Sequence, residues 1–228
     1  KIIIINSYSP NIGDLSIIIS MIDCLRAKIP NAEFSVFATN PQLTSKYIDG
    51  VSVYRSLGSR SGKLWRQTIN FLMLLRNWCW IYFRKKGVNL FFLVRRKTRH
   101  ALYEYIDADV IVSCGGGYLN DNSGCAFLGC LFDIYLGSLT KKTVMLYAQS
   151  IGPFSNKWLK RIAKKVLNNV DLIALRDEVS VKFLEELGVK TPRIFVTADA
   201  ALLLPKSETK TTYELLNKLG IDPELHLV

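Results

Sequence analysis

Acidic residues are missing from one long segment of this 228-residue sequence: none lies between Asp49 and Glu104, although the segment holds twelve Lys and Arg. In the rest of the chain, 18 basic residues stand against 19 acidic ones, so the formal net charge of +11 comes from this segment. Charge confined in this way excludes a uniformly basic protein and predicts an anionic surface or an anionic ligand as a partner.

Metal-binding and nucleotide-binding motifs are also scarce. The five cysteines include no CxxC pair, and there are only two histidines, which argues against a structural zinc site and favours free thiols in a reducing cytosol. The sequence has neither a GxGxxG loop nor a GxxxxGK[ST] loop, which disfavours NAD binding and P-loop nucleotide chemistry. We expect no metal and no cofactor.

Long apolar runs are absent as well. Within the basic segment, the longest stretch without a charge is residues 67–75, far short of the roughly 20 residues that span a membrane as a helix. The apolar start at residues 2–5 is too short for the core of a signal peptide.

Short apolar segments, rich in Val, Ile and Phe, alternate with helical patterns. Strands that are apolar on both faces belong to parallel sheets covered by helices. The sequence therefore predicts an α/β fold with a Rossmann-like, doubly wound, mostly parallel sheet. The expected strands are residues 2–5, 33–38, 51–54, 109–113, 143–148, 172–175 and 194–197. The expected helices are residues 14–28, 63–86, 97–107, 126–137, 156–168 and 178–187.

A polar stretch after Pro205 marks the expected domain boundary. Residues 1–204 form the predicted amino-terminal Rossmann-like domain, and residues 205–228 form a linker helix and the start of a second domain that is missing here. The apolar end at 225–228 is typical of the opening of a strand, which needs partners in another sheet. An edge strand of the first sheet is the alternative.

The expected helix at 63–86 combines basic residues with tryptophans on an otherwise apolar surface. Such a helix is typical of the membrane interface. A helix buried in the core or in an oligomer interface is the alternative. Nucleic acid is not expected, because the aromatic residues lie among aliphatic ones instead of forming a stacking face. The residues predicted to face an anionic membrane are Trp65, Arg66, Trp78, Trp80, Arg84, Lys85 and Lys86.

The loop after the first strand carries polar residues at the carboxyl edge of the sheet, where α/β proteins bind ligands. Its residues Asn11, Gly13 and Asp14 directly precede a predicted helix. Gly13 allows close approach of the backbone. The Asp14 carboxylate either faces the binding crevice or is a plain helix cap.

Three glycines follow the strand at 109–113. Gly115, Gly116 and Gly117 leave backbone N–H groups free to point at an anion, and the N-terminus of a following helix would add partial positive charge. Asp121 either positions a hydroxyl or caps that helix. A glycine turn without a ligand is the alternative.

The later strands end in residues suited to sugars and anions. Gln149 and Ser150 are neutral hydrogen bonders that suit sugar hydroxyls. Arg176 offers a planar fork for a carboxylate or a phosphate. A structural pair is the alternative, in which Asp177 orients Arg176. The other residues expected at this edge are Ser180 and Asp199.

In this order, the elements resemble the polysaccharide pyruvyltransferase family. The resemblance spans about residues 2–204 and implies one half of a GT-B-like architecture, in which two Rossmann-like domains face a cleft. The matching motifs are Asn11-x-Gly13-Asp14, Asp109-x-Ile-x-Ser-x-Gly115-Gly116-Gly117-x-Leu-x-Asp121, Gln149-Ser-Ile-Gly152-Pro153, Arg176-Asp177-x-x-Ser180 and Asp199.

The resemblance implies a transferase that moves the pyruvyl group of phosphoenolpyruvate onto two sugar hydroxyls as a cyclic ketal, in surface polysaccharide biosynthesis. Arg176 would hold the donor, and Asp14 or Asp121 would orient or deprotonate the acceptor hydroxyl. The acid that protonates C3 would belong to the second domain. The residues expected to bind donor or acceptor are Asn11, Gly13, Gly115, Gly116, Gly117, Gln149, Ser150, Asp177, Ser180 and Asp199.

The expected location is the cytoplasm, with peripheral attachment to the inner face of the cytoplasmic membrane as one option. The saccharide acceptor would be free or lipid-linked. The sequence leaves the oligomeric state undecided. Two alternatives remain: a GT-B glycosyltransferase that uses a nucleotide sugar, and a non-catalytic protein that binds a membrane surface.

Overall fold

A computed structural model describes residues 1–8, 10–58, 64–88, 90, 92, 94–205 and 209–222, and it confirms the predicted α/β class. The strands are β1 (Ile2–Ser7), β2 (Phe34–Ala38), β3 (Ser52–Arg55), β4 (Val110–Ser113), β5 (Gly116–Leu119), β6 (Thr143–Ile151), β7 (Leu172–Leu175) and β8 (Arg193–Val196). The helices are α1 (Ile12–Lys28), α2 (Pro41–Thr44), α3 (Leu64–Lys85), α4 (Arg96–Asp107), α5 (Cys125–Leu139), α6 (Lys157–Leu167), α7 (Val179–Leu187) and α8 (Thr209–Lys218). Two short 3-10 turns are η2 (Asp121–Ser123) and η3 (Ala200–Leu203).

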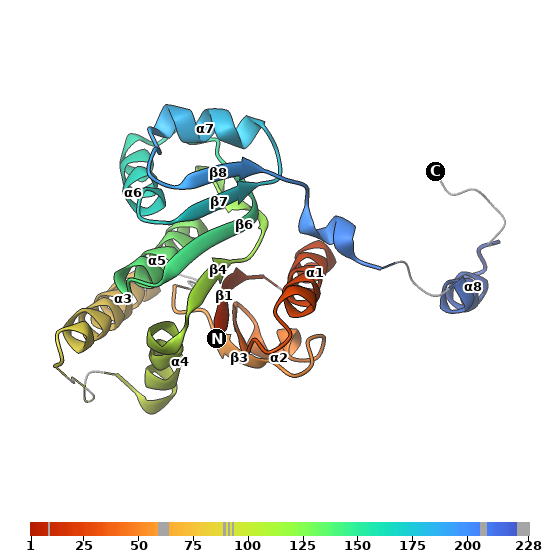
Figure 1. The fold of residues 1–228 in the computed structure, drawn as a ribbon, viewed down its shortest axis with the longest axis horizontal. Coiled ribbons are helices and arrows are strands. Elements are labelled where there is room, and N and C mark those ends of the chain that lie inside the picture. The colour runs from red at the N-terminus through yellow and green to blue at the C-terminus, as the bar shows by residue number, and fades with distance from the viewer. Residues whose placement is uncertain are drawn as a thin grey trace.

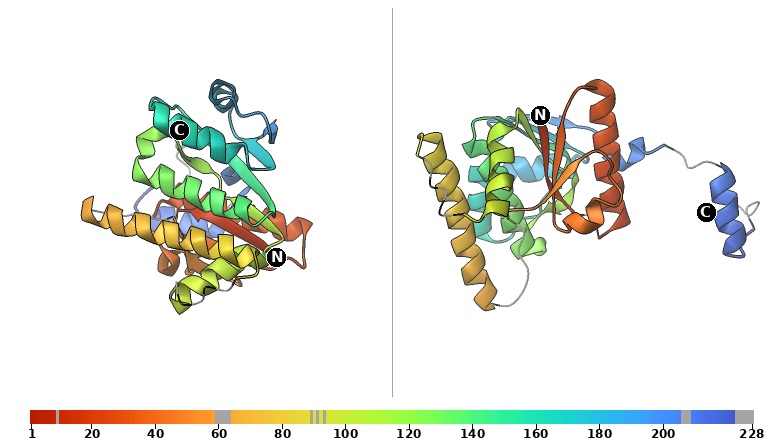
Figure 2. Two further views of the ribbon diagram at one scale, coloured as in Figure 1. Left: turned by 90° about the vertical axis from the view of Figure 1, so that its left-hand side faces the viewer. Right: turned by 90° about the horizontal axis from the view of Figure 1, so that it is seen from below.

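The sheet has eight parallel strands in the order β3-β2-β1-β4-β6-β7-β8, with β5 paired to β6 beside this path. Helix α1 covers one face, and α3, α4 and α5 cover the other (Figures 1 and 2). Because side chains alternate along a strand, the buried strand β1 serves both layers. Ile3 and Ile5 belong to the core under α4 and α5, whereas Ile2 and Ile4 belong to the core under α1.

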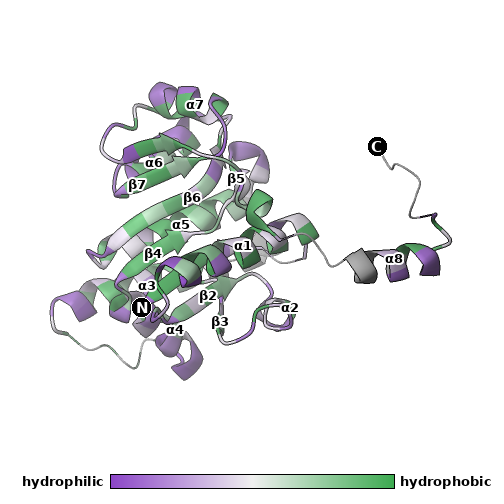
Figure 3. Ribbon diagram, turned by 45° about the vertical axis from the view of Figure 1, so that its right-hand side comes forward, coloured by the Kyte–Doolittle hydropathy of each residue, from purple (hydrophilic) through white to green (hydrophobic). Residues whose placement is uncertain are grey.

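The central strands are apolar because they are covered on both sides. Strands β4 and β6 and helix α5 are predominantly hydrophobic (Figure 3), as expected for a parallel sheet between helical layers. The sequence predicted a glycine loop at residues 115–117, but Gly116 and Gly117 begin strand β5. Gly116 is in register with Gln149 of β6. Every parallel strand ends at the same edge, which gathers the loops that carry the predicted site.

Helix α3 packs part of its surface in the core, as one of its two predicted roles requires, and its contact with a membrane stays a prediction. Trp80 is fully buried, with 0% exposure, so its predicted contact with a membrane is wrong; it packs in the core with Ile81. Trp78 is half-buried and packs against the same core. The side chains of Trp65 and Arg66 lie outside the described residues. None of the described helices has the length and apolar character needed to cross a membrane.

Helix α8 lies apart from the sheet (Figure 1). The predicted strand at 225–228 falls outside the described residues. The domain boundary at 204 and the second domain therefore stay predictions.

Candidate active site at the carboxyl edge of the sheet

Arg176 is the first residue after β7, and its guanidinium is held from two sides. Its Nε donates to Ser150 Oγ at 2.7 Å, and its Nη1 forms an ion pair with Asp199. The side chains of Arg176 and Asp199 are 26% and 31% exposed, so the pair is shielded but reachable. No described residue accepts a hydrogen bond from Nη2. The structure therefore presents one guanidinium nitrogen to a ligand.

A second layer of polar contacts fixes Ser150. Its hydroxyl donates to Asp177, whose other carboxylate oxygen accepts from the backbone N–H and the hydroxyl of Ser180. Burial acts to raise the pKa of Asp177, but the hydrogen bonds from Ser150 and Ser180 outweigh it and hold that pKa below its usual value. Asp177 thus supports Arg176 through Ser150. The direct Arg176–Asp177 pair that the sequence left open is not formed, because the ion pair of Arg176 with a described residue is with Asp199.

Asp14 lies in the first turn of α1 and is half-buried. It is not the helix cap, because Asn11 fills that position and its Oδ1 accepts from the N–H of Gly13 at 2.9 Å. Burial raises the pKa of Asp14; the positive charge of Arg176 opposes this shift, and the negative charge of Asp199 adds to it. The charges of Arg176 and Asp199 therefore lie close enough to Asp14 to change its pKa.

Two of the predicted glycines line the space between Asp14 and Arg176. A Cβ on Gly117 would lie 3.3 Å from Arg176 Nη2, and a Cβ on Gly116 would lie 3.7 Å from Asp14 Oδ1. Gly115 has a packing role instead, because a Cβ there would lie 2.9 Å from the carbonyl oxygen of Tyr147. The absence of side chains at 116 and 117 keeps both charged groups accessible.

Other predicted ligand contacts are corrected by burial. Gln149 is 0% exposed and donates through Nε2 to the carbonyl oxygen of Gly116 at 2.6 Å. Ser180 is buried too and accepts from the N–H of Ile151 at 2.8 Å. Gln149 ties β6 to the start of β5, and Ser180 ties α7 to the end of β6, so neither side chain can touch a ligand from its buried position.

Asp121 has its carboxylate engaged by the loop that precedes α6. Its Oδ2 accepts hydrogen bonds from the backbone N–H groups of Ser155 and Asn156, and these bonds lower its pKa. This geometry favours a role in holding the β6–α6 loop, and a catalytic role for Asp121 has no support in it.

Sequence reasoning missed a cavity of about 380 Å³ at the same edge, with a mostly apolar lining that also contains polar side chains. Its residues include Asn6, Tyr8, Tyr118 and Asp133. Asn6 has a left-handed backbone with φ of 62° and donates to Ser113 Oγ at 3.0 Å, a conformation that Asn tolerates better than most residues. Burial raises the pKa of Asp133 to about 7, against the hydrogen bonds from Ser56 and Gly58. The sequence signal for this cavity was Asp133, which is the single acidic residue in the largely apolar sequence of α5.

The fold and the edge site define a Rossmann-like α/β protein with an arginine and two acids at the carboxyl ends of its strands. The family described as "Polysaccharide pyruvyl transferase" matches residues 11–225, so the chain belongs to that family. The "Amylovoran biosynthesis protein AmsJ" of Erwinia amylovora is 31% identical over 97 residues, which cover 42% of this chain and 22% of that protein. No solved structure matches the chain.

Proposed function

We propose that this chain supplies the Arg176 side of an active site that transfers the pyruvyl group of phosphoenolpyruvate to a saccharide. The observation that carries the proposal is the Arg176 guanidinium, which is fixed by Ser150 and Asp199 and leaves Nη2 beside Gly117. Phosphoenolpyruvate has a carboxylate and a phosphate, and a fixed guanidinium suits either one. The family supports a transferase. In the proposed reaction, phosphoenolpyruvate is the donor substrate, and the chemistry requires no cofactor.

The reaction would use the charges at the edge as follows. Protonation of C3 of the enol leaves C2 electron-poor, a sugar hydroxyl attacks C2 and loses its proton, and phosphate departs as the C2–O bond breaks. A second hydroxyl of the same sugar then attacks C2, loses its proton to the departing phosphate and closes the ketal. Asp14 would accept the proton of the attacking hydroxyl, because burial makes its carboxylate a stronger base than an exposed one. The proton for C3 would come from a general acid, a role that we assign to no described residue of the edge site.

The test uses the longest natural form of the protein with phosphoenolpyruvate and a lipid-linked saccharide extract. We expect phosphate release together with a saccharide mass increase of one pyruvyl ketal. Arg176→Ala should raise the KM for the donor at least about tenfold, since the charge-assisted contact from Nη2 is lost, and Arg176→Lys should restore only part of it.

The matched control is Arg193→Ala, which removes the same charge from an exposed arginine at the start of the neighbouring strand β8. It should leave donor KM unchanged. If Arg176→Ala behaved like Arg193→Ala, the role of Arg176 would be refuted. Transfer of a sugar from a nucleotide sugar, with no use of phosphoenolpyruvate, would assign the site to a glycosyltransferase.

We further propose that the outer face of α3 attaches the enzyme to an anionic membrane surface in the cytoplasm, where a lipid-linked acceptor would be presented. This face exposes Leu72, Leu75 and Phe83, at 58%, 45% and 38%. Arg84 and Lys85 lie in the last turn of α3 and Lys86 directly follows it, and Lys85 and Lys86 are exposed. Apolar side chains beside basic ones suit the lipid interface.

Vesicle flotation tests this attachment. We expect binding to vesicles that contain phosphatidylglycerol, weakening with salt, and loss of binding in Leu75→Asp. Val179→Asp, at an exposed apolar position on α7, is the control and should bind as the native chain does. Equal binding to neutral phosphatidylcholine vesicles, or none at all, would refute the proposal.

A further inference from the structure

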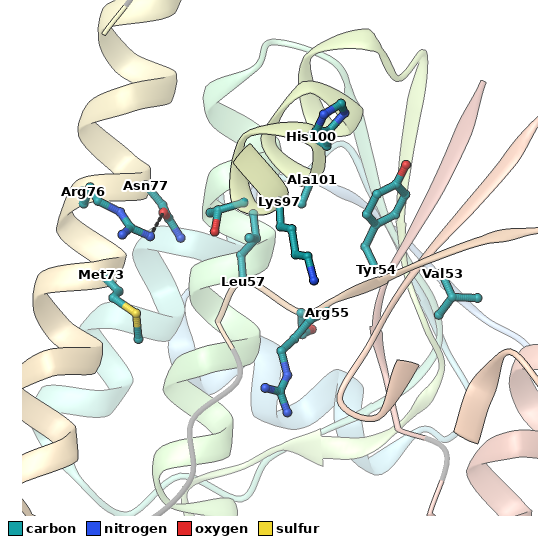
Figure 4. Close-up of a pocket in the computed structure, with 12 residues that line it drawn as sticks. Val53, Tyr54, Arg55, Leu57, Met73, Arg76, Asn77, Lys97, His100 and Ala101 are labelled. Carbon is teal, nitrogen blue, oxygen red and sulfur yellow. Dashed lines mark hydrogen bonds between the residues drawn. The ribbon is translucent and has the colours of Figure 1, made fainter. Parts of the chain in front are cut away.

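A cavity of about 820 Å³ lies between the end of β3 and helices α3 and α4. Figure 4 shows that its cationic side chains come from three elements: Arg55 from β3, Arg76 from α3 and Lys97 from α4. The His100 side chain of α4 also lines the cavity. The lining also contains Leu57 and Met73, which give it an apolar part. The cavity is therefore large enough for an organic molecule and carries charge of one sign.

The positive charge of this cavity is not compensated. None of its described lining residues is acidic, and none of its cations takes part in an ion pair with a described residue. Arg76 is the clearest case. Its Nη2 donates to Asn77 Oδ1 at 3.2 Å, but its Nε is buried without a hydrogen-bonding partner. Burial and the charge of Arg95 both lower the pKa of Arg76. A shielded, unpaired guanidinium is costly unless an anion binds it.

The N-terminus of α4 adds to the positive charge of the cavity. Its cap residue Arg95 makes no side-chain capping bond, and Arg96 and Lys97 occupy the first turn, which has no acidic residue. A helix N-terminus carries partial positive charge and unsatisfied N–H groups, so basic residues there are unfavourable and an anion is favourable. Lys97 and Thr98 of this turn line the cavity.

We propose that this cavity binds the phosphate or diphosphate group of an organic phosphate, whose remaining part lies along the apolar lining. A phosphate accepts several hydrogen bonds at once, which suits cations that converge from three elements. The ligand is either the phosphate-bearing head of a lipid carrier or a soluble phosphate compound. The inference goes beyond the proposed transfer reaction and does not depend on it.

The cavity is separate from the edge site around Arg176. In the sheet, β3 is one edge strand and Arg176 follows β7, with β2, β1, β4 and β6 between them. Asp14, Arg176 and Asp199 are not among the lining residues of the cavity. Two anions could therefore bind at the same time.

The test measures pyrophosphate binding by calorimetry to the full chain in the Arg176→Ala background, which removes the arginine of the edge site. We expect one equivalent to bind. Lys97→Gln and Arg76→Gln should each weaken binding about tenfold or more, because each loses a charge-assisted hydrogen bond. Arg96→Gln, the same charge change one position away on α4 but outside the lining, should change affinity less than about twofold.

Lys97 is exposed, so Lys97→Gln keeps the test valid even if Arg76→Gln fails to fold. No binding of pyrophosphate, or equal losses in Lys97→Gln and Arg96→Gln, would overturn the proposal. Tighter binding of a single-stranded oligonucleotide, lost in the same variants, would also overturn it and assign the cavity to nucleic acid.

A second arm separates the two sources of the phosphate. Phosphatidylcholine vesicles that contain a polyprenyl diphosphate should capture the chain, and Lys97→Gln should abolish capture, if the ligand is a lipid carrier. Binding of pyrophosphate without such capture would assign the site to a soluble phosphate. Neither result depends on turnover of phosphoenolpyruvate, so a failure of the proposed transfer reaction would be seen separately.

Discussion

The backbones of Gly58 and Gly129 are in direct contact. A Cβ on Gly58 would lie 2.0 Å from the carbonyl oxygen of Gly129, and a Cβ on Gly129 would lie 2.1 Å from the carbonyl oxygen of Gly58. Beside this contact, Asp133 of α5 accepts hydrogen bonds from the N–H of Gly58 at 2.9 Å and from Ser56 Oγ at 3.0 Å. The chain that leaves β3 is thereby fixed to α5.

Gly129→Ala should therefore destabilise the protein, although alanine favours a helix more than glycine does by roughly 1 kcal/mol. The added methyl group meets backbone, which cannot move aside as a side chain can, and we expect a net loss of about 1–3 kcal/mol in the free energy of unfolding. Gly137→Ala in the same helix is the control, because there the new Cβ meets only side-chain atoms of Ile111 and Val144. Equal stabilities of the two variants in urea would contradict this prediction.

Asp133 should make stability depend on pH. Its folded-state pKa of about 7 lies above the ordinary value of 3.8, so the folded protein holds a proton that the unfolded chain releases. The stabilisation is fully present below pH 3.8 and is lost as the pH rises to about 7, a loss of roughly 4 kcal/mol by this group alone.

Urea unfolding of the native chain and of Asp133→Asn across this pH range measures the effect. The free energy of unfolding of the native chain should fall relative to that of the variant as the pH rises from 4 to 7. A constant difference between the two proteins would show that Asp133 does not titrate in this window.

Ser150 should act as a positioning residue for Arg176. Ser150→Ala removes the acceptor of the Arg176 Nε hydrogen bond, and a lost hydrogen bond to a charged group costs about 1.5–3 kcal/mol. We expect the KM for the donor to rise about tenfold with a smaller change in kcat. Ser155→Ala, an exposed serine in the loop after the same strand β6, should leave both constants unchanged. A fall in stability with unchanged KM would reduce Ser150 to a structural role.

The strands and helices were largely predictable because burial on both faces leaves apolar runs in the sequence. Strand β7 has its predicted bounds, and α4 begins one residue earlier than expected. Strand β5 was missed because its sequence, Gly-Gly-Tyr-Leu, has no β-branched residue and its pairing depends on the irregular end of β6. Trp80 was misplaced because α3 is apolar on several sides, so periodicity alone does not tell which side faces the core.

The sequence predicted where the site lies, at the carboxyl edge of the sheet, but not which of its side chains contact a ligand. Topology brings Asp14, Arg176 and Asp199 together, since they follow the carboxyl ends of β1, β7 and β8 at that edge. Sequence could not separate ligand contacts from supporting ones, because the same side chains serve both purposes. The separation is decided by burial, which encloses Gln149 and Ser180.

Asp14 should control how kcat/KM depends on pH. If its carboxylate accepts the proton of the acceptor hydroxyl, only the ionised form is active, so kcat/KM should rise with pH through the pKa of Asp14. Burial places that pKa above its usual value of 3.8, despite the opposing charge of Arg176. Asp14→Asn should lower kcat by roughly 10²–10⁴-fold and remove this acidic limb.

The control for Asp14→Asn is Asp23→Asn, an exposed acid on the same helix α1. It should keep both the rate and the limb of the pH profile. The two variants remove the same charge from one helix, so a difference between them reports the position of the carboxylate and not the net charge. If Asp14→Asn lost its activity through a raised donor KM alone, with the limb intact, Asp14 would be a binding residue and the base would have to be another group.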